Sequence, residues 1–207
     1  MLTKIAVFVS GGGTNLQALI DAQKKGIIKD GKISLVIASN DKCYAIERAK
    51  QNGIPCAVVA KKGTSQAEFE QKICGKLDEY GIELIVLAGF MCILSAEFTK
   101  KYPERIINVH PSLIPSFCGK GFYGLKVHEA ALDYGVKVTG ATVHFVNEVP
   151  DGGKIIAQRA VEIEDVDTPE TLQRRVMEQA EWKLLPQAID LIANGRVEVT
   201  EGRTRIR

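Results

Sequence analysis

An asparagine and a histidine stand two positions apart at the end of the apolar segment "RIINVHPSLIP", residues 105–115. Side chains two positions apart on a strand share a face, so Asn108 and His110 can address one small volume. The following Pro111 keeps His110 out of helical geometry and ends the strand there. An amide and an imidazole side by side can donate hydrogen bonds to an oxyanion, which predicts acyl-transfer chemistry.

A carboxylate is the expected third member of this group. Asp151 in "VPDGGK" is the best candidate, because the two glycines after it let the backbone fold closely against a ligand. We expect its carboxylate to raise the pKa of His110 and to favour imidazolium at neutral pH. His144 alternates with apolar neighbours and is expected to be packed rather than catalytic, while His128 caps a helix or touches ligand. No G-x-S-x-G element is present, so a covalent acyl-enzyme is not predicted.

A glycine-rich turn, "SGGGTNLQ", precedes a helical pattern near the N-terminus. Such a turn presents N–H groups and the positive end of the helix dipole to an anion. Leu16 occupies the place of the third glycine of a dinucleotide fingerprint, and no acidic residue ends the second strand, so a dinucleotide is disfavoured. A single phosphate, with Thr14 and Asn15 as side-chain donors, is preferred over a plain tight turn.

These residues lie at the ends of elements that alternate along the first half of the chain. Apolar runs predict strands at 4–10, 32–40, 56–60, 83–90 and 105–110, and helical spacing predicts helices at 14–26, 44–53, 65–81 and 95–102. Unbroken apolar strands that alternate with helices indicate an open α/β, mostly parallel sheet with helices on both faces. Ligands of such sheets bind outside the carboxyl ends of the strands, so we expect four loops to converge: 11–15, 39–41, 89–94 and 108–112.

The pattern changes after Pro111. A Pro- and Gly-rich loop, 111–124, leads to a short helix near 126–135 and to two alternating strands that are expected to pair antiparallel at the sheet edge. A last helix is expected from Thr168, whose hydroxyl suits its N-terminus, to about 194–195, and the alternation of 196–207 permits a hairpin. We expect a single domain, 1–207, with halves at 1–110 and 111–207.

Composition excludes several classes of protein. The chain of 207 residues carries 27 basic and 25 acidic residues with no basic run, which does not indicate nucleic-acid binding. Its five cysteines contain no C-x-x-C, which argues against disulfides and a zinc site. No apolar stretch approaches the ~20 residues that span a bilayer, and no signal peptide is recognised. A cytoplasmic protein without metal or membrane partner is expected.

Five segments together carry a family resemblance: "VSGGGTNLQALID", "VLAGFMCILS", "INVHPSLIPSF", "GATVHFVNEVPDGGKIIAQ" and "EQAEWKLLP". They resemble the phosphoribosylglycinamide formyltransferases, and the similarity covers essentially the whole chain. The resemblance implies a Rossmann-like fold with an added antiparallel strand. It also implies direct transfer of a formyl group from 10-formyltetrahydrofolate to the amine of glycinamide ribonucleotide, in de novo purine biosynthesis.

The resemblance also implies site residues. The catalytic group would be Asn108, His110 and Asp151, with an ordered water relaying a proton to the folate. The nucleotide would be held by Gly13, Thr14, Asn15 and Glu181. The folate would be held in the second half of the chain by Asn108, Val146, Asn147, Val149 and Asp151, and in the first half by Met91, Cys92, Ile93 and Leu94. Gln66 and Cys92 stand where many members have basic residues, so contact with the folate's glutamate tail is not expected there. A monomer or weak homodimer is expected.

Three alternatives stay open. A methionyl-tRNA formyltransferase would carry a further C-terminal domain and a basic surface, whereas this chain is almost neutral. A formyltetrahydrofolate hydrolase would carry an N-terminal regulatory domain, for which strand-loop units that begin at Lys4 leave no room. A non-catalytic nucleotide-binding module would keep the glycine-rich turn but would not need the amide, imidazole and carboxylate together.

Overall fold

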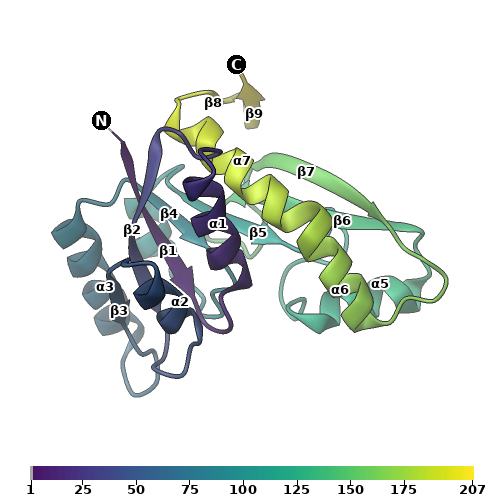
Figure 1. Cartoon of the computed structure of the whole chain (residues 1–207), viewed down its shortest axis with the longest axis horizontal. Helices are drawn as coiled ribbons and strands as arrows, with labels where there is room; N and C mark the ends of the chain where they lie inside the picture. Colours follow the sequence, from purple (N-terminus) through teal and green to yellow (C-terminus); the bar gives the residue numbers. More distant parts are fainter. Residues whose placement is uncertain (1) are drawn as a thin grey trace. The chain divides into compact units, whose positions relative to one another are not determined.

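The computed structural model describes residues 2–207 (Figure 1). The strands are β1 (Thr3–Val9), β2 (Gly31–Ala38), β3 (Cys56–Val58), β4 (Leu84–Leu87), β5 (Ile106–His110), β6 (Val138–Phe145), β7 (Ile155–Glu162), β8 (Val197–Thr200) and β9 (Arg203–Ile206). The helices are α1 (Thr14–Lys24), α2 (Ala45–Gln51), α3 (Gln66–Tyr80), α4 (Ala96–Lys101), α5 (Leu125–Tyr134), α6 (Pro169–Val176), the π-helical η1 (Met177–Glu181) and α7 (Trp182–Ala193).

The strands confirm the predicted α/β class. A mixed, mostly parallel sheet has the strand order β3-β2-β1-β4-β5-β6-β7, and β8 and β9 form a separate hairpin. Residue contacts divide the chain into two compact units, 1–107 and 108–207. None of the helices in residues 2–207 combines the length and apolar character needed to cross a membrane.

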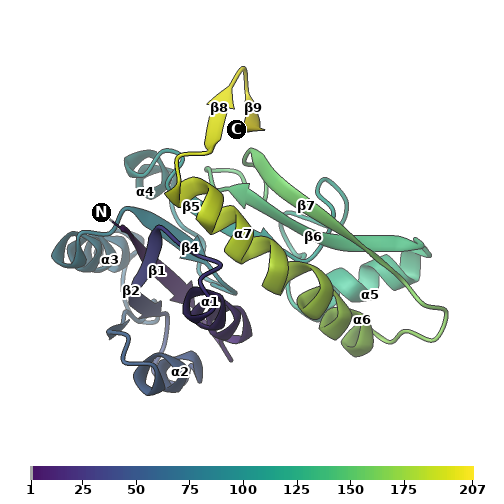
Figure 2. The same cartoon turned by 45° about the horizontal axis from the view of Figure 1, so that its top comes forward.

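The first unit is built around β1. This strand pairs parallel with β2 and with β4, and β2 pairs parallel with β3. Helices α1 and α3 lie on opposite sides of β1 and β2 (Figure 2). Both faces of the strands are therefore covered, which explains why residues 5–9 of β1 are all fully buried and why the strands read as unbroken apolar runs.

The two long helices of the first unit begin differently. Helix α3 starts with a capping box, in which Ser65 and Glu68 satisfy each other's backbone N–H groups. Helix α1 follows Gly13, which has a left-handed φ of 71° and supplies no side-chain cap. The first N–H groups of a helix need partners from outside the helix, so this uncapped end is available to a ligand.

In the second unit, β6 and β7 pair antiparallel, as predicted, and α7 packs along them (Figures 1 and 2). Thr168 caps α6 through its hydroxyl, with Pro169 in the first turn, which confirms the predicted helix start. The predicted final helix is present from Pro169 to Ala193, and a π-helical turn, Met177–Glu181, joins α6 to α7 within it. A π-helical turn accommodates one extra residue, and a search for the 3.6-residue period of an α-helix does not reveal such an insertion. The permitted C-terminal hairpin forms as β8 and β9.

Candidate active site

His110 ends strand β5 with its imidazole almost completely buried, 4% exposed. Its Nε2 atom lies 2.9 Å from the carbonyl oxygen of Phe117, in the Pro- and Gly-rich loop. Because a carbonyl oxygen only accepts hydrogen bonds, Nε2 carries the proton and donates. Phe117 has a φ of 47°, in the left-handed region that costs a residue with a side chain about 1–2 kcal/mol. The loop thus holds a strained backbone conformation where it meets His110.

Asp151 approaches His110 from the turn after β6. Its Oδ2 atom lies 3.5 Å from Nδ1 of His110 and accepts a hydrogen bond of 2.8 Å from the N–H of Gly119. Asp151 has a φ of 55°, a conformation that aspartate tolerates better than most residues. The structure therefore brings the carboxylate and the imidazole together, as the sequence predicted.

His144 is a member of this group that the sequence interpretation missed. It is packed, as expected, with 1% of its surface exposed, but its Nε2 lies 3.6 Å from Oδ1 of Asp151 and 3.3 Å from the amide nitrogen of Asn108. Its Nδ1 lies 2.8 Å from the carbonyl of Phe145, so Nδ1 carries a proton, and Nε2 lies between the Asn108 amide and the Asp151 carboxylate. The position of His144 at the end of β6, one short turn before Asp151, was the available signal.

The ionisation of His110 differs from the sequence prediction. Burial is the largest effect on its pKa and lowers it below the ordinary value, and His144 lowers it further. The Phe117 carbonyl and the Asp151 charge raise the pKa, but the net direction is downward. Asp151 raises the pKa as predicted, but the expected imidazolium at neutral pH is wrong, because removing the ring from water outweighs the effect of the carboxylate. We conclude that the imidazole is neutral at neutral pH and donates through Nε2.

Asp151 is held in its charged form. Burial alone would raise its pKa, but the interaction with the His144 side chain, the electrostatic interaction with His110 and the hydrogen bond from the Gly119 N–H together lower it. A carboxylate that receives several donors in this way stays ionised far below neutral pH. Although two imidazoles flank it, no group of metal-binding side chains is formed here or elsewhere in residues 2–207.

The turn that carries Asp151 is closed by its own backbone. Val149 donates to the Asn147 side chain at 3.0 Å, and Gly152 donates to the Val149 carbonyl at 3.0 Å. A Cβ at Gly153 would lie 1.7 Å from the carbonyl oxygen of Phe145. A Cβ at Gly152 would likewise lie 2.6 Å from the Val149 side chain, so both glycines are required for closing the hairpin, and Val146 beside them is half-buried.

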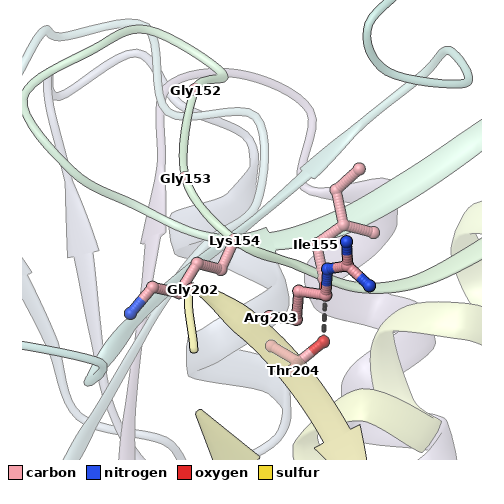
Figure 3. Close-up of a pocket in the computed structure, with 7 residues that line it drawn as sticks. All are labelled: Gly152, Gly153, Lys154, Ile155, Gly202, Arg203 and Thr204. Carbon is pink, nitrogen blue, oxygen red and sulfur yellow. Dashed lines mark hydrogen bonds between the residues drawn. The ribbon is translucent and has the colours of Figure 1, made fainter. Parts of the chain in front are cut away.

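A pocket of about 420 Å³ is lined by Gly152, Gly153, Lys154, Ile155, Gly202, Arg203 and Thr204 (Figure 3). The Thr204 hydroxyl donates to the carbonyl of Ile155, which fastens the β8–β9 hairpin to β7. Lys154 and Arg203 extend in different directions, so they do not converge on one small anion (Figure 3). The lining includes neither Asp151 nor the imidazoles of His110 and His144. We therefore assign no binding role to the pocket and regard it as the place where the hairpin is held against β7.

In the first unit, Ser10 joins three of the loops that were predicted to converge. Its hydroxyl accepts from Ser39 at 2.7 Å and from the N–H of Met91 at 2.8 Å, and its N–H donates to the carbonyl of Gly89 at 3.1 Å. The loops after β1, β2 and β4 therefore meet at one edge of this sheet, where parallel strands place their ligands.

The glycine-rich turn has the geometry of an anion site. Gly13 occupies its left-handed conformation so close to α2 that a Cβ would lie 2.6 Å from the Cβ of Ala45. Thr14 and Asn15 follow as the first residues of α1, with Thr14 exposed. Only glycine fits at position 13, and α1, which has no side-chain cap, begins directly after this turn.

The segment Met91–Leu94 divides into exposed and buried side chains. Met91 and Ile93 are exposed by 56% and 77%, whereas Leu94 is buried at 9%. Leu94 thus packs inward, and its side chain does not line a surface pocket as the sequence interpretation expected.

Burial raises the pKa of the Cys92 thiol, despite the lowering effect of a hydrogen bond with Ser39, so Cys92 carries no charge at neutral pH.

Gln66 supports this segment from α3. Its amide donates to the carbonyl of Ile93 at 3.1 Å and to Glu70 at 2.6 Å, and Glu70 accepts in turn from both the N–H and the hydroxyl of Ser95. Gln66 therefore fixes the backbone of this loop. In the second unit, Glu181 is 6% exposed and ends the π-helical turn. An inserted turn of this kind is frequent where a helix presents a functional side chain.

Comparison of the sequence and the fold with known proteins identifies relatives that match nearly the whole chain. Residues 3–189 match the family described as "Formyl transferase". Phosphoribosylglycinamide formyltransferase of Haemophilus influenzae is 40% identical over 97% of this chain and 92% of its own length. The trifunctional purine biosynthetic protein adenosine-3 of Gallus gallus is 45% identical over 96% of this chain, which spans 19% of that longer protein. The crystal structure of glycinamide ribonucleotide transformylase 1 from Symbiobacterium toebii has a TM-score of 0.92 at 38% identity and covers 99% of this chain and 94% of its own.

Proposed function

Because this chain belongs to the formyl transferase family, among the phosphoribosylglycinamide formyltransferases, we propose that it formylates the amine of glycinamide ribonucleotide with 10-formyltetrahydrofolate as donor. The observation that carries the proposal is the cluster of Asn108, His110 and Asp151, in which two donors and an ionised carboxylate meet. The product would enter de novo purine biosynthesis.

The nucleotide would be bound at its phosphate by the turn at Gly13, Thr14 and Asn15. The left-handed glycine and the uncapped start of α1 support this assignment, because both leave backbone N–H groups for an anion. Glu181 would accept hydrogen bonds from the ribose hydroxyls, since a carboxylate is an acceptor for two neighbouring O–H groups.

The folate would be bound by two segments. Met91 and Ile93 expose apolar side chains that suit the face of a flat aromatic ring, and the backbone of Cys92 and Leu94 continues that segment. The turn at Val146, Asn147 and Val149 would offer backbone donors and acceptors to the polar ring edge, because its residues are partly or fully exposed.

The reaction requires stabilisation of the oxygen that becomes negative when the amine attacks the formyl carbon. The Asn108 amide and the Nε2–H of His110 are the two donors we assign to that oxygen. Nε2–H donates to the Phe117 carbonyl in this structure, so the oxyanion must replace Phe117 as its acceptor. The donor is a neutral imidazole, in keeping with the lowered pKa of His110.

Asp151 would manage the proton. The attacking nitrogen forms one C–N bond and loses one proton, while the folate nitrogen loses its C–N bond and gains one proton, so the step balances without a further reactant. Asp151 remains ionised and can accept the proton and return it, through an ordered water, to the departing nitrogen. The same carboxylate lies 3.5 Å from Nδ1 of His110 and raises the pKa of that ring.

The experiment mixes the purified protein with glycinamide ribonucleotide and 10-formyltetrahydrofolate and follows deformylated folate by absorbance. We expect folate release to depend on the nucleotide and formylated nucleotide to accumulate in equal amount. Formate release without the nucleotide would show a hydrolase instead, and nucleotide binding with no turnover would show a non-catalytic module.

A further inference from the structure

Arg48 of helix α2 lies against the glycine-rich turn and contacts its backbone. Its Nε donates to the carbonyl oxygen of Gly12 at 2.8 Å, and its Nη1 donates to the Gln17 side chain at 3.3 Å. The guanidinium carbon also lies 5.2 Å from the centre of the Tyr44 ring. Three contacts thus fix the orientation of one arginine beside the turn, and none of the motifs that indicated a phosphate site included it.

This contact determines where a neighbouring N–H group points. In a trans peptide the C=O and the following N–H point in opposite directions. The carbonyl of Gly12 is directed to Arg48, so the N–H of Gly13 is directed away from α2. The N–H of Ala45 likewise donates to the carbonyl of Gly11 at 3.2 Å, which turns the N–H of Gly12 the same way.

Two successive N–H groups on one side of a turn form a concave anion-binding site. Neither the N–H of Gly12 nor that of Gly13 finds an acceptor within residues 2–207. Helix α2 therefore binds the carbonyls of Gly11 and Gly12 on its own side of the turn, and the N–H groups of Gly12 and Gly13 point to the other side. Gly13 must stay a glycine for this packing, since its Cβ would collide with Ala45.

We propose that Arg48 is a positioning residue that sets the phosphate affinity of the glycine-rich turn by holding the Gly12 carbonyl. The inference rests on the proposed function and assigns a further residue to its nucleotide subsite. Arg48 acts through the peptide between Gly12 and Gly13 and takes no part in formyl transfer. Its effect is thus confined to binding of the phosphate end.

The test compares Arg48→Met, Arg48→Lys and the control Lys50→Met, which removes an exposed charge from the same helix. The KM for glycinamide ribonucleotide, kcat, and the Ki of inorganic phosphate are measured at constant ionic strength. We expect Arg48→Met to raise KM and Ki about 10-fold, as the loss of a charge-assisted hydrogen bond predicts. The kcat of Arg48→Met should change less than about twofold, and so should the KM, kcat and Ki of Lys50→Met. Arg48→Lys should recover part of the affinity for phosphate, because the lysine ammonium can still donate a hydrogen bond.

Unchanged KM and Ki in Arg48→Met, or an equal rise in Lys50→Met, would overturn the inference. If Arg48→Met does not fold, as judged by its circular dichroism, the Ki of Arg48→Lys decides in the same way: a rise of about threefold supports the inference and an unchanged value opposes it. Phosphate binding is also followed by the shift of the thermal midpoint with phosphate concentration. A wild-type protein that binds phosphate but transfers no formyl group would contradict the proposed function and leave the Arg48 comparison intact.

Discussion

The Oδ2 atom of Asp151 lies 3.5 Å from Nδ1 of His110, although His110 ends β5 and Asp151 lies in the turn after β6. The carboxylate reaches this position because a tight turn after β6 is closed by glycines and because the N–H of Gly119 holds it. Its second oxygen faces His144 at 3.6 Å. One charged group therefore lies between two buried imidazoles, and each substitution in this group has a distinct expected effect.

Asn108→Ala removes the amide donor. We expect kcat/KM for formyl transfer to fall by about 10²–10³, the usual effect of losing one oxyanion donor. Phosphate inhibition should keep its wild-type Ki, because the glycine-rich turn is unaffected. Asn194→Ala, which removes an exposed amide at the end of α7, serves as the matched control and should retain activity. Near-normal turnover of Asn108→Ala would contradict the assigned role.

Asp151→Asn changes the pH profile as well as the rate. The Asp151 charge raises the pKa of His110, so its removal lowers that pKa further. We expect kcat to fall by about 10² and the acid limb of kcat/KM, which reports protonation of His110, to move to lower pH. Profiles between pH 5 and 8 measure both effects. An acid limb that moves to higher pH would show that burial is not what controls this imidazole.

His144→Leu tests the residue that the sequence interpretation placed outside the site. The change removes the ring nitrogen that faces both the Asn108 amide and the Asp151 carboxylate, and with it one interaction that keeps Asp151 ionised. We expect kcat to fall about tenfold with little change in KM, since orientation is lost and no substrate contact is removed. His144→Gln should recover part of the rate, because its side-chain oxygen can accept from Asn108. Equal losses in both variants would argue for a purely structural role.

Gly13→Ala tests the packing of the glycine-rich turn. A side chain there meets both an unfavourable φ of 71° and the Cβ of Ala45 at 2.6 Å. We expect a loss of about 1–2 kcal/mol in the free energy of unfolding and a higher KM for the nucleotide. Adding Ala45→Gly relieves the collision but not the strain in φ, so the double variant should recover only part of the affinity. A wild-type KM in Gly13→Ala would exclude the turn as the phosphate site.

His128→Leu tests a buried histidine that does not contact Asp151. Burial and the nearby His110 lower the pKa of His128 to about 4, and neither of its ring nitrogens has a hydrogen-bond partner in residues 2–207. The histidine of the unfolded chain binds a proton below pH ~6.5, whereas that of the folded chain binds one only near pH 4. The free energy of unfolding therefore falls by about 2–3 kcal/mol as the pH is lowered through this interval. The Leu variant should lose most of this dependence in urea titrations at pH 8 and pH 5. An unchanged pH dependence would show that another group is responsible.

The sequence by itself determined the elements and most of the site's membership. Unbroken apolar runs, helical periodicity and capping residues are local features, so the strands of the first unit and the capped start of α6 at Thr168 could be predicted. Alternation along β5 placed Asn108 and His110 on one face, and the positions of strand ends predicted the junction of loops at Ser10.

Only the tertiary structure decided quantities that depend on neighbours distant in the sequence. The pKa of His110 is lowered because burial outweighs Asp151, and burial is a property of the packed chain. His144 belongs to the site because β6 ends beside the turn at Asp151, and the turn at Gly12 is oriented by Arg48 from another helix. A residue's type states which proton or charge it can carry, whereas its desolvation and its partners determine which form it takes.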